Sequence, residues 1–281
     1  MTNLYGNYFI QNLINNSNFK QINLIYTYIQ KDYVHIAKDY SGTHVLQKLL
    51  DYNKNLLDNN NSNNHIKILE KIILASIIDK EIEMACHTNA THVLQKIILT
   101  IPEQNRQYLN EKIYSNLIDL CLDSNGICLV KKIISSTKHI LNKKRIINII
   151  STRCIEISQN PYGNYAIQFL IEEWGIHLCY EIVNKIIENI SNLSMQKYSS
   201  NVSEKIIELI DENNIDYVYQ KLFDENILLN ILKNKYGRFV LQKAVKIMNK
   251  GKKEEIKKNL LKINLNSNKE KNRLKSFLGC F

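Results

Sequence analysis

The chain has 281 residues, of which 44% are hydrophobic and 23% charged, as in an ordinary globular protein. With only 2 prolines and 8 glycines, it excludes Gly-rich β architectures and favours helices joined by short connections. The formal net charge of +10 suits a polyanionic partner, either nucleic acid or an anionic membrane surface. Residues 246–281 carry 11 Lys and Arg against 3 Asp and Glu, so +8 of this charge lies there. A solvated terminal helix and tail or a nucleic-acid contact would each explain this segment.

Several classes of protein lack support in the sequence. The 6 cysteines form no CxxC pair, and no signal peptide or run of 18 apolar residues is present, so we expect a reducing, cytoplasmic setting without a membrane. Cys86, His87 and His92 have no second ligand pair at zinc spacing, so no metal is expected. No phosphate-binding loop and no nucleophile with a matched base occurs, so we expect neither an enzyme nor a cofactor.

One pattern recurs seven times along the chain. In order, the segments read LYGNYFIQNLI, YSGTHVLQKLL, TNATHVLQKII, SNGICLVKKII, PYGNYAIQFLI, YSSNVSEKIIE and KYGRFVLQKAV. We number as i the residue that follows the Gly, Ala or Ser. Position i falls at Asn7, Thr43, Thr91, Ile127, Asn164, Ser200 and Arg238, at intervals of 36, 48, 36, 37, 36 and 38. Such regular spacing is typical of a stacked repeat architecture.

The elements of each repeat follow from its apolar spacing. After the second segment, residues 53–64 read NKNLLDNNNSNN, a polar insert that accounts for the long interval and predicts a surface loop. The fifth repeat predicts a helix from Asn164, a break at Gly175, a second helix through Asn189 and a short third segment. Three such helices cannot bury their apolar faces alone. The sequence therefore predicts an all-α, right-handed, curved α-solenoid of stacked three-helix repeats of about 36 residues.

Three positions vary while their neighbours stay apolar. Residues i and i+4 lie one turn apart on the same helix face, and i+1 lies about 100° round from i. Positions i and i+4 can therefore hold the edge of one planar group, with i+1 beside it, which suits unstacked bases of single-stranded RNA. The candidate RNA-binding residues are Asn7, Tyr8, Gln11, Thr43, His44, Gln47, Thr91, His92, Gln95, Cys128, Lys131, Asn164, Tyr165, Gln168, Ser200, Asn201, Glu204, Arg238, Phe239 and Gln242.

Each of these residues alone has a simpler explanation. Asn and Ser near a helix start are common N-caps, and a Tyr or Phe on a helix is often a core residue. Lysine at i+5 recurs in five repeats, where it would reach a phosphate or only be solvated. Those lysines are Lys48, Lys96, Lys132, Lys205 and Lys243.

The segments resemble the Pumilio (PUF) family of RNA-binding proteins over residues 1–263. SSNVSEKIIE looks like that family's guanine-recognising repeat, and PYGNYAIQFLIEEWG and KYGRFVLQKAV flank it in family order. The resemblance implies a repeat domain at 1–263, with about seven repeats, an incomplete first repeat and the insert at 53–64, followed by a basic tail at 264–281. By family order the repeats resemble the second to the eighth of the usual eight.

The resemblance also implies an antiparallel pairing of repeats with bases. Ser200 and Glu204 would then recognise G, the Asn/Gln pairs U, and the Thr/Gln pairs A, giving 5′-(U)-G-U-N-A-A-U-3′. The fourth repeat departs from the pattern with Ile127, Cys128 and Lys131, and the last with Arg238 at i, so these bases are left unassigned. The implied function is post-transcriptional regulation by a monomer that binds mRNA 3′-untranslated regions and recruits repressor or deadenylation proteins.

Two other functions remain open from the sequence. A protein-binding α-solenoid adaptor would explain the stacking but not the signature residues. A relative that binds RNA without sequence preference, in ribosome assembly, would predict degraded signatures in most repeats.

Overall fold

A computed structural model describes residues 1–58, 63–262 and 267–280, and every regular element within these ranges is helical. The chain divides into two compact units, Met1–Ile146 and Ile147–Phe281, here called unit 1 and unit 2. None of the helices in the described ranges combines the length and apolar character that crossing a membrane requires.

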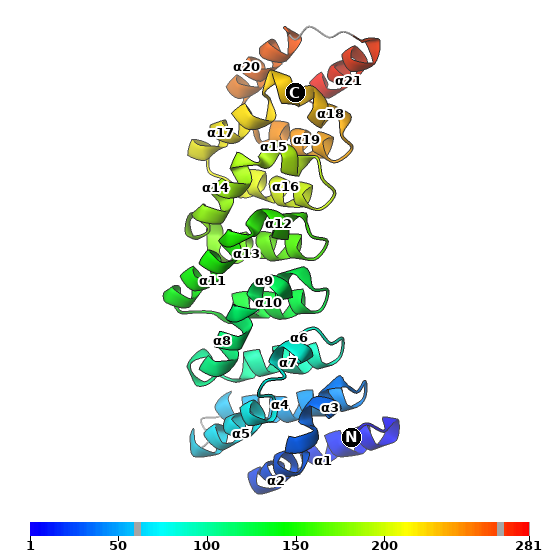
Figure 1. Cartoon of the computed structure of the whole chain (residues 1–281), viewed down its shortest axis with the longest axis vertical. Coiled ribbons are helices and arrows are strands. Elements are labelled where there is room, and N and C mark those ends of the chain that lie inside the picture. Colours follow the sequence, from blue (N-terminus) through cyan, green and yellow to red (C-terminus); the bar gives the residue numbers. More distant parts are fainter. Residues whose placement is uncertain (59–62, 263–266, 281) are drawn as a thin grey trace. The chain divides into compact units, whose positions relative to one another are not determined.

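Unit 1 contains four helices that carry the repeated pattern, here called motif helices: α1, α4, α7 and α10. Each contacts the next, and Figure 1 shows them in successive layers. The helices in chain order are α1 (Leu4–Asn15), α2 (Phe19–Ile29), η1 (Gln30–Asp32), α3 (Tyr33–Lys38), α4 (Gly42–Asp58), α5 (Asn63–Ser76), α6 (Glu81–Ala85), α7 (Ala90–Thr100), η2 (Glu103–Asn105), α8 (Gln107–Ser115), α9 (Leu117–Leu122), α10 (Gly126–Ser136) and α11 (Ile140–Thr152), which ends in unit 2.

Unit 2 contains the motif helices α13, α16 and α19, and again each contacts the next. Its helices in chain order are α12 (Cys154–Gln159), α13 (Gly163–Leu178), α14 (Tyr180–Glu188), α15 (Ile190–Ser194), α16 (Ser199–Leu209), α17 (Glu212–Leu222), α18 (Glu225–Lys233), α19 (Gly237–Ile247), α20 (Lys250–Leu261) and α21 (Asn268–Leu278).

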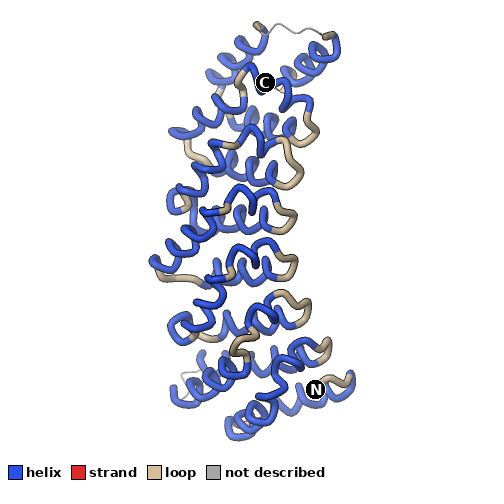
Figure 2. Tube along the Cα trace, in the orientation of Figure 1, coloured by secondary structure: helices blue, strands red, loops and turns tan. Residues whose placement is uncertain are grey.

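The three-helix repeat predicted from the sequence is confirmed in the fifth repeat. Helix α13 is interrupted at Gly175, whose φ of 80° and ψ of 158° are non-helical, and α14 and α15 follow. A positive φ costs glycine little because it has no Cβ. Figure 2 shows this alternation of helices and short loops. The all-α architecture of stacked three-helix repeats is thereby established within each unit.

The core of each repeat lies between the motif helix and the short helix before it. Positions i+2, i+3, i+6 and i+7 are mostly apolar and buried, for example Ala166, Ile167, Leu170 and Ile171, and α13 contacts α12. Burying one such Leu or Ile contributes about 1.5–3 kcal/mol, so the stacking of repeats stabilises the fold. In the first repeat the equivalent Phe9 and Leu13 are exposed, and no short helix precedes α1 among the described residues.

Four motif helices, α4, α10, α13 and α19, approach the preceding short helix very closely. A Cβ at Gly42 would lie 2.4 Å from the carbonyl oxygen of Ile36, and one at Gly163 would lie 2.5 Å from that of Ile157. Real Cβ atoms essentially never come this close to a backbone oxygen. Position i−1 therefore requires a very small residue in these repeats, which fixes how deeply the motif helix packs.

The insert and the basic C-terminal segment are more helical than the sequence analysis predicted. The loop prediction for residues 53–64 is wrong at 53–58 and 63–64, which belong to α4 and α5, while 59–62 lie outside the described residues. Asn53 is buried, so α4 continues past the predicted start of the loop because this side chain packs against the repeat. In the segment predicted as a basic tail, α21 contacts α18 and buries Leu274 and Phe277. The boundary after residue 263 stays a prediction.

Candidate nucleic-acid interface

The three signature positions differ systematically in exposure. Position i is buried in six repeats: Asn7, Thr43, Thr91, Ile127, Asn164 and Ser200. Position i+4 is half-buried in all seven: Gln11, Gln47, Gln95, Lys131, Gln168, Glu204 and Gln242. Position i+1 is exposed in all seven: Tyr8, His44, His92, Cys128, Tyr165, Asn201 and Phe239. A planar ligand would thus meet i+1 and i+4 first, with i beneath them.

The Asn/Gln pairs are preorganised by hydrogen bonds. The Gln11 side-chain amide donates to Asn7 Oδ1 at 2.8 Å, and Gln168 donates to Asn164 Oδ1 at 3.0 Å. The Asn164 amide in turn donates to the backbone oxygens of Asn160 and Pro161, each at 3.0 Å. The buried Asn164 therefore holds Gln168 in place, and Gln168 offers an amide that can both donate and accept. Tyr165, 55% exposed, stands beside it with its ring available for stacking.

In the Thr/Gln pairs the hydroxyl also supports the glutamine. Gln47 donates to Thr43 Oγ1 at 3.3 Å, and Gln95 donates to Thr91 Oγ1 at 3.2 Å. The Thr43 hydroxyl itself donates to the backbone oxygen of Asn89 in the next repeat, at 3.2 Å. A hydroxyl has only one proton to donate, so in this arrangement Thr43 positions Gln47 and offers no proton to a ligand.

The sixth repeat carries a carboxylate where the others have an amide or a lysine. The Ser200 hydroxyl donates to the backbone oxygen of Lys197 at 3.4 Å, and Glu204 is half-buried. Burial raises the pKa of the Glu204 carboxyl, nearby Lys243 lowers it, and Glu208 raises it. An ionised carboxylate accepts hydrogen bonds only, so its chemistry matches a ligand edge that carries donors.

The two repeats left unassigned from the sequence also differ in structure. In the fourth, Ile127 is buried and offers no hydrogen bond below Lys131. In the last, Arg238 is exposed, unlike the other residues at i, and its guanidinium lies 5.6 Å from the Phe239 ring centre. Gln242 approaches Cys280, with Nε2 and Sγ 3.9 Å apart. The chemistry of these repeats therefore differs from that of the other five.

Signature residues of neighbouring repeats line a shared groove in unit 1. This hollow, of about 410 Å³, lies at α1 and α4. The Tyr40 and His44 rings meet there edge to face, with centres 5.8 Å apart. The lining residues are Asn7, Tyr8, Gln11, Tyr40, Ser41, His44, Gln47, Lys48 and Asp51. A planar group placed here would meet Asn7 and Gln11 of the first repeat and Gln47 of the second, together with aromatic rings.

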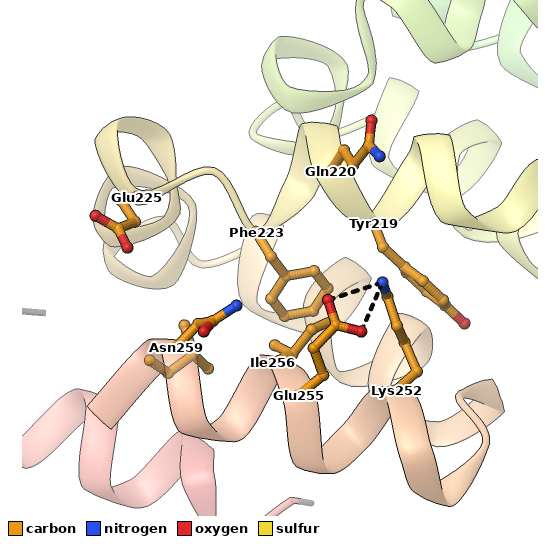
Figure 3. A pocket seen from close by; sticks show the side chains of 9 residues that line it. Tyr219, Gln220, Phe223, Glu225, Lys252, Glu255, Ile256 and Asn259 are labelled. Carbon is orange, nitrogen blue, oxygen red and sulfur yellow. Dashed lines mark hydrogen bonds and ion pairs between the residues drawn. The ribbon is translucent and has the colours of Figure 1, made fainter. Parts of the chain in front are cut away.

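A separate cavity in unit 2 lies apart from the signature residues. It measures about 140 Å³, and Figure 3 shows Tyr219, Phe223 and Ile256 in its lining, with Lys252 paired to Glu255. Its lining residues come from α17, α18, α20 and the turn between α17 and α18, none of which is a motif helix. No cluster of three or more His, Cys, Asp or Glu side chains suited to a metal occurs among the described residues.

Capping residues at i−4 were missed in the sequence analysis. Asp39 Oδ1 accepts from the backbone nitrogens of Ser41 and Gly42, and Asn160 Oδ1 accepts from those of Tyr162 and Gly163. Asn3, Asp123 and Asn234 do the same, and His87 uses Nδ1. The simpler explanation of Asn7 and Asn164 as N-caps is therefore wrong, because another side chain caps each of these helices. All seven repeats carry a polar residue at i−4 in the sequence, which was the available signal.

The lysines at i+5 are partly engaged within the protein. Lys96 forms an ion pair with Asp51, Lys205 with Glu172 at 2.5 Å, and Lys243 with Glu208 at 3.1 Å. The sequence had offered phosphate contact or simple solvation for all five lysines. Three of them instead have an acidic partner in the preceding repeat.

Each helical repeat presents a buried, a half-buried and an exposed signature position, in the same order along the array. This arrangement defines an α-solenoid with the features of a nucleic-acid-binding protein. The profile of the Pumilio-family RNA binding repeat matches residues 1–29, 32–55, 82–109, 153–187 and 189–223, which together exceed half of the chain. The chain belongs to this family. The matched ranges omit the signatures of the fourth and last repeats, the two that depart from the pattern.

Curated relatives span most of the chain. It is 25% identical to Pumilio homolog 12 of Arabidopsis thaliana, covering 95% of this chain and 43% of that protein. It is 24% identical to Fem-3 mRNA-binding factor 1 of Caenorhabditis elegans, covering 86% of this chain and 43% of that protein. The chain thus spans less than half the length of these relatives.

Solved structures share the fold. The Puf4 RNA binding domain bound to an HO endonuclease RNA 3′ UTR recognition sequence has a TM-score of 0.82 at 23% identity, covering 99% of this chain and 86% of that one. PUF-8 in complex with PBE-RNA has a TM-score of 0.77 at 22% identity, covering 99% and 79% respectively. At this identity the likeness establishes the all-α repeat fold alone.

Proposed function

We propose that the protein binds single-stranded RNA sequence-specifically, with one base per repeat, at UGU-containing elements of mRNA. The observation that carries this proposal is the regular exposure of the signature. In five repeats a polar residue at i lies beneath a half-buried hydrogen-bonding residue at i+4, beside an exposed planar side chain at i+1. An α-solenoid that binds other proteins would not require this combination of side-chain chemistry and burial.

The proposed register assigns a base to each of these five repeats. The Glu204 carboxylate accepts from the N–H donors on the Watson–Crick edge of G. Gln168 and Gln11 each offer a donor and an acceptor to U, and Gln47 and Gln95 face A. With the last repeat at the 5′ end, the element is 5′-(U)-G-U-N-A-A-U-3′, in which N faces the fourth repeat.

The proposed cellular role is post-transcriptional regulation in the cytoplasm. By analogy with relatives named as mRNA-binding factors and neighbours bound to 3′ UTR sequences, the target is a 3′-untranslated region. Binding as a monomer and recruitment of repressor or deadenylation proteins complete this proposal.

Binding to two RNA strands tests the function. We expect 5′-UGUAAAU-3′ to bind about tenfold to a hundredfold more tightly than the same strand with its G changed to C, as for a mismatched base in a specific site. Equal affinity for both strands would favour RNA binding without sequence preference. Absence of binding to either strand would favour a protein-binding adaptor.

A further inference from the structure

Lysine at i+5 lies one helical turn beyond the exposed residue at i+1, at the edge of the signature surface. Five repeats have it, and all five lysine side chains are only half-buried. All five lysines occupy the same position of the repeat, but their surroundings in the structure divide them into two groups.

The first group is held by acids of the preceding repeat. Lys96 pairs with Asp51, which is position i+8 of the second repeat. Lys205 pairs with Glu172 at 2.5 Å, and Glu172 is position i+8 of the fifth repeat. The same offset therefore places an acid beside lysine in separate units of the molecule.

In unit 2 these pairs join into a continuous line of charges across α13, α16 and α19. Lys205 also lies 3.8 Å from Glu208, and Glu208 pairs with Lys243 at 3.1 Å. Glu208 is position i+8 of the sixth repeat. The order along this line is Glu172, Lys205, Glu208, Lys243, so each positive charge has a negative neighbour.

The second group, Lys48 and Lys132, faces no such acid. Position i+8 of the preceding repeat is Asn15 for Lys48 and Leu99 for Lys132. Neither lysine forms a salt bridge with a described residue, and Lys48 lines the groove that holds the signature residues of the first two repeats. Both of these lysines belong to unit 1.

We propose that the residue at i+8 determines which lysines bind RNA phosphates, so that Lys48 and Lys132 contact the backbone while Lys96, Lys205 and Lys243 are held by acids. The proposal rests on the RNA-binding function above. Exposed ion pairs contribute little to stability, so a structural reason for the acids is weak. A lysine already neutralised by a carboxylate displaces few counterions from the RNA. An unpaired lysine that binds a phosphate displaces the full number and gains the corresponding affinity.

The salt dependence of binding measures phosphate contacts directly. Each contact to a single strand contributes about 0.7 to the slope of log affinity against log salt. We expect Lys48→Met and Lys132→Met each to lower the slope by about 0.7, and affinity for 5′-UGUAAAU-3′ about fivefold at about 0.1 M KCl. The double variant Glu172→Gln/Lys205→Met conserves net charge and is expected to keep the wild-type slope. An equal loss of slope in this double variant and in Lys132→Met would overturn the proposal.

A carboxylate introduced at i+8 should form an ion pair with the unpaired lysine of the next repeat. Leu99 is exposed, so Leu99→Glu places a carboxylate toward Lys132 without disturbing the core, and Leu99→Gln is its neutral control. We expect Leu99→Glu to lower the slope as much as Lys132→Met, and to have no further effect in the Lys132→Met background. Additive losses would overturn the proposal, because a general charge effect does not depend on Lys132.

Thermal unfolding of each variant establishes that it folds like the wild type. Wild-type protein that binds 5′-UGUAAAU-3′ and its G→C strand equally would contradict the proposed sequence specificity, while the slopes would still decide the role of the lysines. The two failures are therefore distinguishable.

Discussion

Units 1 and 2 share one architecture but present different chemistry on their motif helices. In unit 2 the signature pairs are Asn164 with Gln168 and Ser200 with Glu204, and both lysines at i+5 are ion-paired. In unit 1 two repeats have threonine at i, the fourth has a buried Ile127, and two of three lysines at i+5 lack a salt bridge among the described residues. The difference teaches that base selection and phosphate attraction need not lie in the same repeats.

On this account the sixth repeat of unit 2 contributes the strongest selection of a single base, and unit 1 contributes more of the salt-dependent affinity. A carboxylate or an amide pair distinguishes donors from acceptors on a base edge, whereas Ile127 cannot. An unpaired lysine attracts any phosphate, whatever the base. The following changes test where the two units truly differ and where they agree.

The largest effect is expected where the units agree. Gly163→Val in unit 2 and Gly42→Val in unit 1 would each force a side chain into the backbone of the preceding short helix. We expect each to lower the free energy of unfolding by about 3 kcal/mol or more, measured by urea denaturation. Gly251→Ala, where a Cβ meets only Asn249 Oδ1 at 3.6 Å, is the control and should be neutral or stabilising. A loss as large in Gly251→Ala would contradict close helix approach as the cause.

Base changes in the RNA should separate the units. Replacing the G of 5′-UGUAAAU-3′, which faces the sixth repeat, should cost about 1–3 kcal/mol of binding free energy. Replacing the central A that faces the fourth repeat should change affinity less than about twofold, because Ile127 offers no hydrogen bond. Fluorescence anisotropy with the four bases at each site measures both. A strong preference at the fourth repeat would show that Lys131 selects a base.

A smaller effect is expected from the supporting hydroxyl of unit 1. Thr43→Val keeps the side-chain shape but removes the donor to the backbone oxygen of Asn89, so the unfolding free energy should fall by about 1 kcal/mol. The control is Thr91→Val, since the Thr91 hydroxyl accepts a hydrogen bond from Gln95 of its own repeat. Chemical denaturation that finds the two variants equally stable would contradict the inter-repeat role of Thr43.

The smallest expected effect is the pH dependence of base preference in unit 2. Because burial raises the pKa of Glu204, its carboxylate becomes protonated as the pH falls through that raised value and loses acceptor capacity. The preference for G over C should therefore decline with acidification, measured from about pH 7.5 down to about pH 4.5. Lys243→Met removes the charge that lowers this pKa and should move the decline to higher pH. A preference independent of pH would contradict recognition by an ionised Glu204.

The same carboxyl links stability to pH. A group whose pKa is higher in the folded than in the unfolded protein contributes stability below its unfolded pKa, and this contribution is lost as pH rises through the folded value. Glu204→Gln should therefore stabilise the fold at neutral pH while it weakens the preference for G. Unfolding curves of the wild type and Glu204→Gln at neutral and acidic pH measure this difference. If Glu204 had a merely structural role, the variant would be less stable than the wild type.

Much of the fold could be predicted because the repeat encodes it locally. Regular spacing predicted the motif helices, and Gly175 marked the break within α13. The shared face of i and i+4, with i+1 beside it, followed from helical geometry. The burial of i beneath i+4 was not predicted, and Arg238 departs from it because a long, charged side chain keeps its head in solvent.

What the sequence could not predict depends on contacts between repeats. The pairing of Lys205 with Glu172 requires the register of two neighbouring helices, which residue spacing within one repeat does not contain. The continuation of α4 through Asn53 depends on burial against the repeat and overrides a composition typical of loops. The docking of α21 through Phe277, whose ring lies 6.4 Å from that of Phe223, likewise depends on tertiary packing.

The central claim is that the residues at i and i+4 select the base, in the register assigned above. The double change Ser200→Asn/Glu204→Gln gives the sixth repeat the pair found in the fifth, Asn164 and Gln168. Selection from an RNA pool randomised at the second base of 5′-UGUAAAU-3′ should then yield U in place of G, with all other positions unchanged. Continued selection of G by the double variant would contradict the account.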